Sequence, residues 1–197
     1  LEDATVLGGH VQMTSAAHAE RTWDELGPGF DVVIDLLDSL NEFGGVAKSD
    51  ADADLSLLGA TRIEASSLSL SATAQAEAEV RATGVLLAVA YGESNPHANL
   101  LVGGDVVIAT AGDLSLSTLA DSRVNVEAKQ SILGPNKSPS DIDVTLAVGV
   151  ASIESTAWIQ QGAMLTVGGN LAVNAQQLKS HDVTSSAGAY EDGAVGT

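Results

Sequence analysis

An internal repeat constrains the fold of this chain more than any other feature of its sequence. Four segments share small residues, one polar residue and then two apolar residues with one residue between them: LGGHVQMTS (7–15), EASSLSLSA (64–72), TAGDLSLST (110–118) and VGGNLAVNA (167–175). The polar residue is His10, Ser67, Asp113 or Asn170, so the spacings are 57, 46 and 57 residues (67 − 10, 113 − 67 and 170 − 113). Self-similarity at a nearly fixed period is typical of repeat proteins, whose stacked copies bury a continuous core.

We therefore divide the chain into repeats at about 10–66, 67–112, 113–169 and, in part, 170–197, all within one segment of 1–197. A second pair of segments, LAVAYGESNPHANL (87–100) and LAVGVASIESTAWI (146–159), matches at an offset of 59 residues (146 − 87). Glycine pairs ahead of the alternating residues predict tight corners, because glycine tolerates positive φ.

Strict alternation of apolar and polar residues begins in the second of these four repeated segments, which we call the glycine-small boxes. Apolar residues occupy every even position from Leu68 to Ala82, and polar or charged residues stand between them. The copy 46 residues later keeps the same parity from Leu114 to Ala128. Period-2 alternation predicts β-strands with one buried face. A helix is the alternative for 72–82, since Ala, Gln, Glu and Arg are good helix formers, but apolar residues at every second position argue against it.

Fifteen extended residues reach roughly 50 Å, so we expect the chain to bend within this run. Two or three coils of about 20–28 residues would then make up one 57-residue repeat, which predicts an all-β parallel β-helix, or β-solenoid. In the last copy Gln177, Lys179 and His181 fall at inward positions, which predicts a change of register after Ala175.

Two insertions interrupt this pattern. In residues 30–42, the residues Phe30, Val33, Ile34, Leu37 and Leu40 lie on one side of a helix, between Pro28 and Gly44. We expect one short helix there, lying on the flank of the solenoid to cover an apolar patch; docking of a partner is the alternative. Residues 131–141 are expected to form an exposed loop.

The composition excludes several classes of protein. With 26 acidic and 8 basic residues the net charge is −18, which opposes binding to nucleic acid and to anionic lipid. There is no cysteine, so a disulfide framework is excluded. No apolar run is long enough for a membrane span, and no signal peptide is recognisable. The sequence starts at Leu1 and ends in GAVGT, so we expect an excerpt of a larger protein.

Three alternating carboxylates, Asp50, Asp52 and Asp54, resemble the start of a calcium loop. The sixth position of that loop is Leu55 and the twelfth is Thr61, where Gly and Glu are required. In a strand these aspartates form one solvated face, which is the favoured interpretation; they are weak calcium candidates, and no other cofactor is expected.

No catalytic constellation is recognisable, so we expect the protein not to be an enzyme. The four histidines are scattered, with no His-x-x-x-His pair, and no GxSxG, P-loop or dinucleotide motif occurs. Some parallel β-helices cleave polysaccharides with carboxylates and basic residues, but here the basic residues are few and dispersed and aromatic platforms are scarce.

The stretch VTLAVGVASIESTAWIQQGAMLTVGGNLAVNAQ (144–176) resembles the long repeat arrays of giant bacterial adhesins and filamentous-haemagglutinin-like exoproteins. The resemblance extends over the chain except residues 30–42 and 131–141. It implies a right-handed parallel β-helix that serves as a stalk, fibre or adhesive surface outside a bacterial cell. No catalytic residue is implied.

We therefore expect a structural segment of a secreted or cell-surface adhesin or fibre, forming a rigid extracellular rod. Its expected partners are itself end to end, flanking repeats of the same chain, surface glycans or another cell-surface protein. A glycan-binding or polysaccharide-degrading β-helix domain is the alternative. A binding module predicts an aromatic or apolar patch on one face, so the positions of Trp23, Tyr91 and Trp158 discriminate between the two.

Overall fold

The computed structural model describes residues 1–22, 44–84, 87–130 and 144–186. Within these ranges the chain consists of β-strands, corners and short turns, without a helix, and every strand pairing is parallel. The predicted all-β class with parallel strands is thereby confirmed. The helix expected at 30–42 and the loop expected at 131–141 lie outside the described residues.

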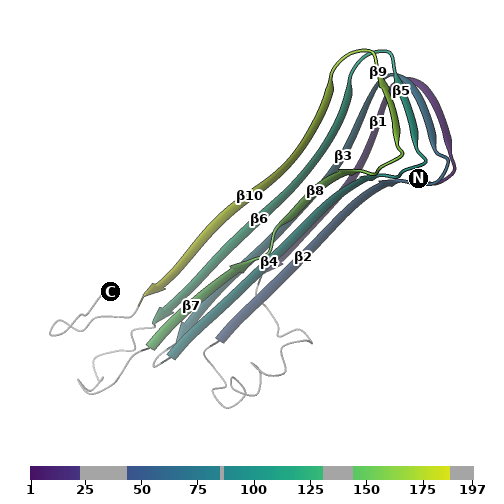
Figure 1. Cartoon of the computed structure of the whole chain (residues 1–197). Helices are drawn as coiled ribbons and strands as arrows, with labels where there is room; N and C mark the ends of the chain where they lie inside the picture. Colours follow the sequence, from purple (N-terminus) through teal and green to yellow (C-terminus); the bar gives the residue numbers. More distant parts are fainter. Residues whose placement is uncertain (23–43, 85–86, 131–143, 187–197) are drawn as a thin grey trace, which may run out of the picture.

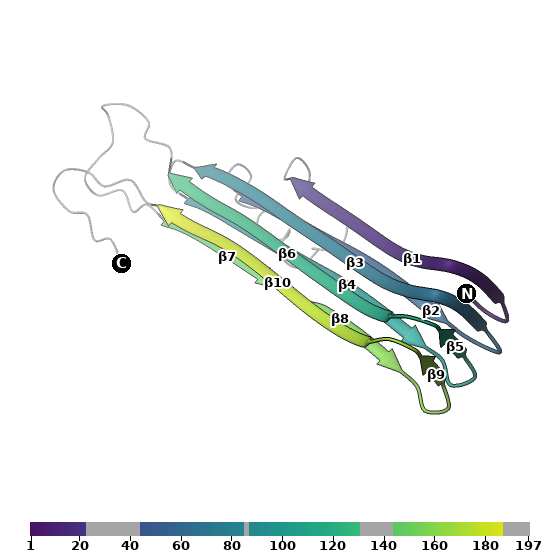
Figure 2. The same ribbon diagram turned by 90° about the horizontal axis from the view of Figure 1, so that it is seen from above.

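In the described ranges, ten strands form two sheets (Figure 1). The six-stranded sheet contains β1 (Thr5–Thr22), β3 (Arg62–Gly84), β5 (Val107–Thr110), β6 (Leu114–Gln130), β9 (Met164–Val167) and β10 (Leu171–Ser186). The four-stranded sheet contains β2 (Gly44–Leu57), β4 (Leu87–Val102), β7 (Val144–Ala151) and β8 (Glu154–Ile159). The chain passes from one sheet to the other and back, so the strands run lengthwise along an extended molecule (Figure 2).

Each passage through a sheet forms one rung, which is a single strand or two strands in line, such as β5 with β6. His10 pairs with Ser67, Leu68 with Leu114, and Leu114 with Leu171, at offsets of 57, 46 and 57 residues (67 − 10, 114 − 68 and 171 − 114). These are the spacings at which the sequence repeats. Equivalent residues of successive repeats therefore lie side by side in neighbouring rungs.

Two details of the predicted repeat are wrong. A repeat does not hold two or three coils, because it supplies one long rung to each sheet. β3 alone is an unbroken strand of 23 residues, so the alternating run is not divided into two strands as expected. The offset between β4 and β7 is 57 and not 59, since Leu87 pairs with Val144 and Val89 with Leu146. A shift of two residues in register leaves the same side chains facing inward, so the alternation of apolar and polar residues does not distinguish an offset of 57 from one of 59.

The core lies between the two sheets and changes in character along the strands. Where the chain turns from the four-stranded to the six-stranded sheet, large aliphatic side chains fill it: Leu57, Ile63, Leu68, Leu70, Leu100, Val102, Val106, Ile108, Leu114 and Leu116. The middle is a cluster of alanines: Ala51, Ala53, Ala72, Ala74, Ala76, Ala98 and Ala120. The far part combines Ala with Val80, Val124 and Val126.

Buried hydroxyl groups join the sheets through this narrow core. The Ser49 Oγ donates a hydrogen bond to the Ala19 carbonyl at 2.8 Å, and the Ser94 Oγ donates one to the Ala76 carbonyl at 2.7 Å. Ser49 pairs with Ser94 and Ala19 with Ala76, so successive rungs repeat the same contact. Hydrogen-bonding to the opposite sheet satisfies a polar group that burial would otherwise destabilise.

The glycine-small boxes behave differently from the expectation of positive φ. Among the described glycines, positive φ occurs at Gly59 (60°) and Gly162 (103°), in the corners of the fold and outside the boxes. In the box at 167–175, a Cβ on Gly168 would lie 2.3 Å from the carbonyl oxygen of Ala111 in the rung below. Glycine is needed there for close backbone approach between rungs. The pairing offset between β3 and the next rung is 45 residues at β5 (107 − 62) and 46 residues at β6 (114 − 68). One extra residue is therefore accommodated between β5 and β6.

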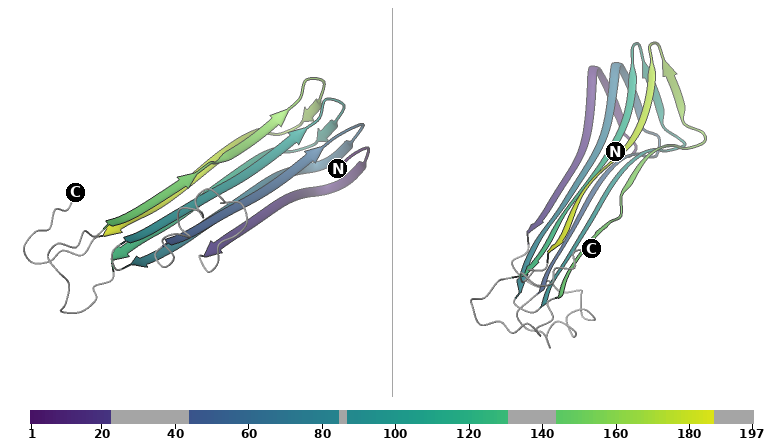
Figure 3. Two further views of the ribbon diagram at one scale, coloured as in Figure 1. Left: turned by 90° about the horizontal axis from the view of Figure 1, so that it is seen from below. Right: turned by 90° about the vertical axis from the view of Figure 1, so that its left-hand side faces the viewer.

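The predicted change of register after Ala175 does not occur. β10 pairs with β6 without interruption from Leu171 to Ser186. Gln177 and Lys179 tolerate inward positions because, in the described part of the chain, β10 pairs with β6 alone and both side chains are exposed. The views in Figure 3 show β10 and β1 on opposite borders of the six-stranded sheet.

Candidate functional surface

The outer face of the four-stranded sheet carries the densest polar network among the described residues. On β2, residues with even numbers point outward and alternate with inward residues such as the buried Ala51 and Ala53. The pairing of Asp50 with Asn95 brings the outward residues of β4 alongside them. Two polar rows therefore run next to each other on this face.

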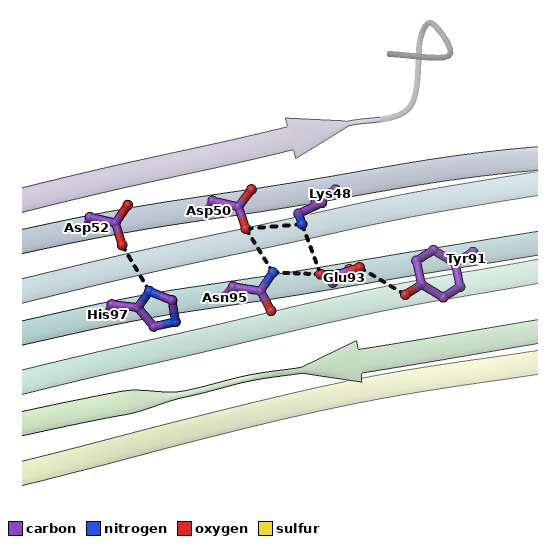
Figure 4. A network of polar contacts seen from close by, with 7 residues as sticks. All are labelled: Lys48, Asp50, Asp52, Tyr91, Glu93, Asn95 and His97. Carbon is purple, nitrogen blue, oxygen red and sulfur yellow. Dashed lines mark hydrogen bonds and ion pairs between the residues drawn. The ribbon is translucent and has the colours of Figure 1, made fainter. Parts of the chain in front are cut away.

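Three in-register pairs link these rows. Figure 4 shows two of them, Asp50 with Asn95 and Asp52 with His97. Asn95 Nδ2 donates to Asp50 Oδ1 at 2.8 Å, and Asn99 Nδ2 donates to Asp54 Oδ1 at 3.1 Å. Between them, His97 Nδ1 lies 3.0 Å from Asp52 Oδ1. Each aspartate thus faces a neutral or ionisable nitrogen group on the next rung, which avoids stacking carboxylate on carboxylate.

Glu93 joins this ladder to a cation and a phenol. It accepts hydrogen bonds from Asn95 Nδ2 at 2.7 Å and from Tyr91 Oη at 2.9 Å, and it lies 3.2 Å from Lys48 Nζ. The hydrogen bond from Asn95, followed by those from Tyr91 and Lys48, lowers the pKa of Glu93 below its ordinary value despite partial burial. The same contact with Glu93 raises the pKa of Lys48, and burial raises the pKa of Tyr91.

The calcium candidates Asp50, Asp52 and Asp54 all lie on this outer face, as a strand requires. Side chains of Asp50 and Asp52 are 53% and 66% exposed, and each is paired with the β4 row. Across the described ranges, no group of three or more His, Asp or Glu side chains is arranged to hold a metal ion. The geometry of these aspartates corresponds to a solvated, hydrogen-bonded ladder.

Two of the three diagnostic aromatic residues also belong to this face. Tyr91 lies on β4 within the Glu93 network, whereas Trp158 lies on β8 beside Leu101 and is 60% exposed. They are ten residues apart in strand position, since Trp158 pairs with Leu101 (101 − 91). They therefore do not form one aromatic patch, and Trp23 lies outside the described residues.

Three side chains outside this network, His10, Arg81 and Arg123, have structural partners. His10 Nδ1 lies 2.6 Å from the Ser67 hydroxyl in the next rung. Arg81 and Arg123 pair with Glu79 and Asp121, two residues away on their own strands, at 2.7 and 3.2 Å. Exposed pairs of this kind contribute little to stability and leave the cations partly neutralised.

His181 differs from the other histidines. Its Nε2 is buried and has no hydrogen-bond partner among the described residues. Burial, followed by the charge on Lys179, lowers its pKa. The inward position of His181 on β10 therefore favours the neutral imidazole.

Sequence analysis found the aspartates but missed Lys48, Glu93 and Asn95 as their partners. The missing signal is an alignment of 44–57 with 89–102, at the 45-residue offset with which β2 pairs with β4. The sequence repeat is recognised from the boxes, all of which lie in the six-stranded sheet. Because the second repeat is shorter than the others, the 57-residue period does not indicate the 45-residue offset between β2 and β4.

Beyond this polar network, the outer face of the same sheet becomes apolar near the first residues of its strands. Val144, Leu146, Val148 and Val150 point outward from β7, while the inward residues of β7 are small. Val144, Leu146 and Val150 are 48%, 50% and 39% exposed. Val89 on β4 pairs with Leu146, whereas Val148 pairs with Tyr91 and Val150 pairs with Glu93 of the polar network.

Comparisons of the chain with protein-family models, with curated proteins and with solved structures find no match. None of the described segments forms a helix that could cross a membrane. The functional interpretation therefore rests on the geometry of this chain.

Proposed function

We propose that the chain is a structural segment of a secreted or cell-surface bacterial adhesin or fibre. In this proposal the two sheets are the walls of a β-solenoid, right-handed as the family resemblance implies, and the segment forms part of a rigid extracellular rod. Its role is mechanical and does not involve catalysis. The acidic exterior, with a net charge of −18, keeps such a rod soluble.

The observation that carries the proposal is the in-register pairing of equivalent residues from successive repeats. In the inner rungs the inward side chains are buried between the same two sheets, so added repeats extend the stack perpendicular to the strands without widening the cross-section of the core. Within the described residues, β1 pairs only with β3 and β10 only with β6, which leaves one edge of each strand unpaired. Such edges accept further parallel rungs, from flanking repeats or from another copy of the chain.

Two measurements test this proposal. Electron micrographs of the purified chain, with calcium and with chelator, should show thin rods in both conditions together with a β-type circular dichroism spectrum. Antibodies raised against the chain should label intact cells of the source organism. Compact particles, or labelling that requires permeabilised cells, would contradict the proposal.

Glycan binding is the second candidate, because Trp158 is exposed on a flat face close to polar side chains. Asn99 and its hydrogen-bonded partner Asp54 occupy the neighbouring outward row, and Thr156 pairs with Asn99. An exposed aromatic ring beside amide and carboxylate groups suits a sugar ring, which needs both apolar stacking and hydrogen bonds. A glycan array probed with the chain and with Trp158→Ala tests this: binding that the substitution abolishes would support it, and a blank array would contradict it.

A further inference from the structure

The two sheets end at different levels on the side of the molecule that β10 borders. Each strand of the four-stranded sheet packs against two neighbouring strands of the other sheet: β2 against β1 and β3, β4 against β3 and β6, and β7 with β8 against β6 and β10. Within the described residues, β7 and β8 pair with β4 alone. A further strand paired with β7 and β8 would lie over the inward side chains of β10, and we call this place the open strand position.

Side-chain exposure marks the open strand position. Leu171 and Val173 on β10 are each 50% exposed, whereas Leu114 and Leu116, their in-register partners on β6, are 0% and 1% exposed. The difference arises because β6 is packed against strands of the other sheet on both sides, β4 and β8, whereas β10 is covered from one side. The inward row of β10 is therefore core-like near the corner and lacks a cover there among the described residues.

The outward side of the same edge is apolar along β7. Val144 and Leu146 are 48% and 50% exposed. A strand paired with β7 would place its own outward side chains directly beside this row, where cross-strand contacts stabilise a sheet. Apolar outward residues in the first half of such a strand therefore suit the open strand position.

The middle of the open strand position is lined by a cation. Lys179 and His181 point inward from β10, at positions where Ser122 and Val124 of β6 are buried. The inward residues of β7 and β8 are uncharged, and Lys179 forms no ion pair with the described residues. The Nε2 of His181 is also without a hydrogen-bond partner in these ranges. A strand that covers this row needs a group that pairs with the Lys179 ammonium.

We propose that the open strand position binds one extended segment of a partner protein, which pairs in parallel with β7 and β8 and places a carboxylate beside Lys179. Unpaired strand edges bind extended segments through main-chain hydrogen bonds, and alternate side chains supply the specificity. Covering Lys179 without a counter-charge is unfavourable, and a facing carboxylate offsets that desolvation. The segment also presents apolar residues toward Leu171 and Val173.

A second copy of the chain fits this position less well. In the register of the repeat, Ala19 and Arg21 of β1 are the equivalents of Lys179 and His181. If β1 of another copy stacked on β10 in that register, it would place Arg21 beside His181 and would supply no carboxylate to Lys179. It would also leave the edge of β7 and β8 unpaired, because β2 lies between β1 and β3, on the far side of β1.

The sequence of β4 provides a probe, because β4 already pairs with both β7 and β8. Its Ser94 points inward and hydrogen-bonds to the Ala76 carbonyl at 2.7 Å and to the Ser122 Oγ at 2.9 Å. Both partners are at the level of Lys179, since Ala76 pairs with Ser122 and Ser122 with Lys179. A peptide of residues 87–102 that carries Ser94→Asp therefore brings a carboxylate to Lys179 when it adds as the next strand. The unchanged peptide and a Ser94→Lys peptide are its matched controls.

Fluorescence anisotropy of the three labelled peptides with the whole chain tests the proposal. The native chain should bind the Ser94→Asp peptide about tenfold more tightly than the unchanged peptide, and the Ser94→Lys peptide least tightly. In Lys179→Ala this preference should fall to about twofold or less, whereas Lys129→Ala, which removes an exposed cation of β6, should retain it. Equal affinity for the three peptides, or no binding, would overturn the proposal.

Hydrogen exchange locates the bound peptide. The Ser94→Asp peptide should protect amides of β7 and β8 and should leave those of β1, at the opposite border of the six-stranded sheet, unchanged. Protection of β1 instead would contradict the proposal, as would self-association of the chain that excludes the peptide; the latter would identify a second copy as the occupant. The proposal needs only the open strand edge, so its failure is distinguishable from a failure of the extracellular rod.

Discussion

The corner end and the middle of the core illustrate how the same repeat can produce different interiors. Near the corners, leucine, isoleucine and valine fill the space between the sheets, and the ribbon opens widely there around β5 and β9 (Figure 1). The middle is lined by seven buried alanines. Because protein interiors are close-packed, sheets separated by alanine must approach each other more closely than sheets separated by leucine. Side-chain volume therefore sets the local width of the molecule.

The largest effect is expected from removing volume at the corner end. Leu70 is fully buried in that cluster, so Leu70→Ala should lower the free energy of unfolding by about 2–5 kcal/mol through lost apolar burial and an unfilled cavity. Urea denaturation measures this change. The matched control Ser69→Ala alters the outward neighbour and should have little effect. A loss below about 1 kcal/mol for Leu70→Ala would contradict a tightly packed corner end.

Adding volume in the alanine region should be the next most damaging change. Ala74 is fully buried among other alanines of both sheets, and Ala74→Leu should cost about 1–3 kcal/mol because the sheets must separate to accept it. Thr73→Leu, on the outer side of the same strand, is the control. If Ala74→Leu were neutral in urea denaturation, the middle of the core would contain unfilled space and the contrast between the two regions would fail.

Between the alanines, Ser94 should contribute a smaller amount through its hydrogen bonds. Its hydroxyl donates to the Ala76 carbonyl and accepts from the Ser122 Oγ at 2.9 Å, and both serines are fully buried. Ser94→Ala should cost about 1–2 kcal/mol, since it leaves the Ser122 hydroxyl unpaired. The double variant Ser94→Ala/Ser122→Ala should recover part of this loss. A double variant less stable than the single one would show that the hydroxyl contact is not the source of the effect.

The smallest effect concerns the exposed polar ladder and depends on pH. Folding lowers the pKa of Glu93 below its ordinary value of 4.5, mainly through the hydrogen bond from Asn95. The ionised carboxylate therefore stabilises the folded state above about pH 4.5, and this contribution disappears as the pH falls through the lower, folded-state pKa. The difference in urea midpoint between the native chain and Glu93→Gln should be largest near neutral pH and should shrink below about pH 4. The control Glu64→Gln changes a carboxylate on the other sheet; a pH-independent difference for Glu93→Gln would contradict the assigned network.

Much of this fold could be predicted from the sequence, because the alternation from Leu68 to Ala82 and its copy 46 residues later specify strands, their inward faces and their pairing. The length of the strands could not be predicted in the same way. Strands are usually short, whereas β3 continues unbroken over 23 residues and is paired along its length with β1, β5 and β6. The cross-rung partners Lys48, Glu93 and Asn95 depend on the 45-residue register of the other sheet, which lacks a glycine-small box to mark it.

The central claim is that successive sequence repeats are neighbouring rungs in a fixed register, and a pair of engineered cysteines tests it most directly. Ser69 and Ser115 are in-register partners that point outward from β3 and β6. Ser69→Cys with Ser115→Cys should form a disulfide within one chain, because paired strands bring the two Cα atoms to about 5 Å. Ser69→Cys with Ser117→Cys, shifted by two residues, should not. Crosslinking that is equal for both pairs, or that favours the shifted pair, would contradict the register on which the account of this protein depends.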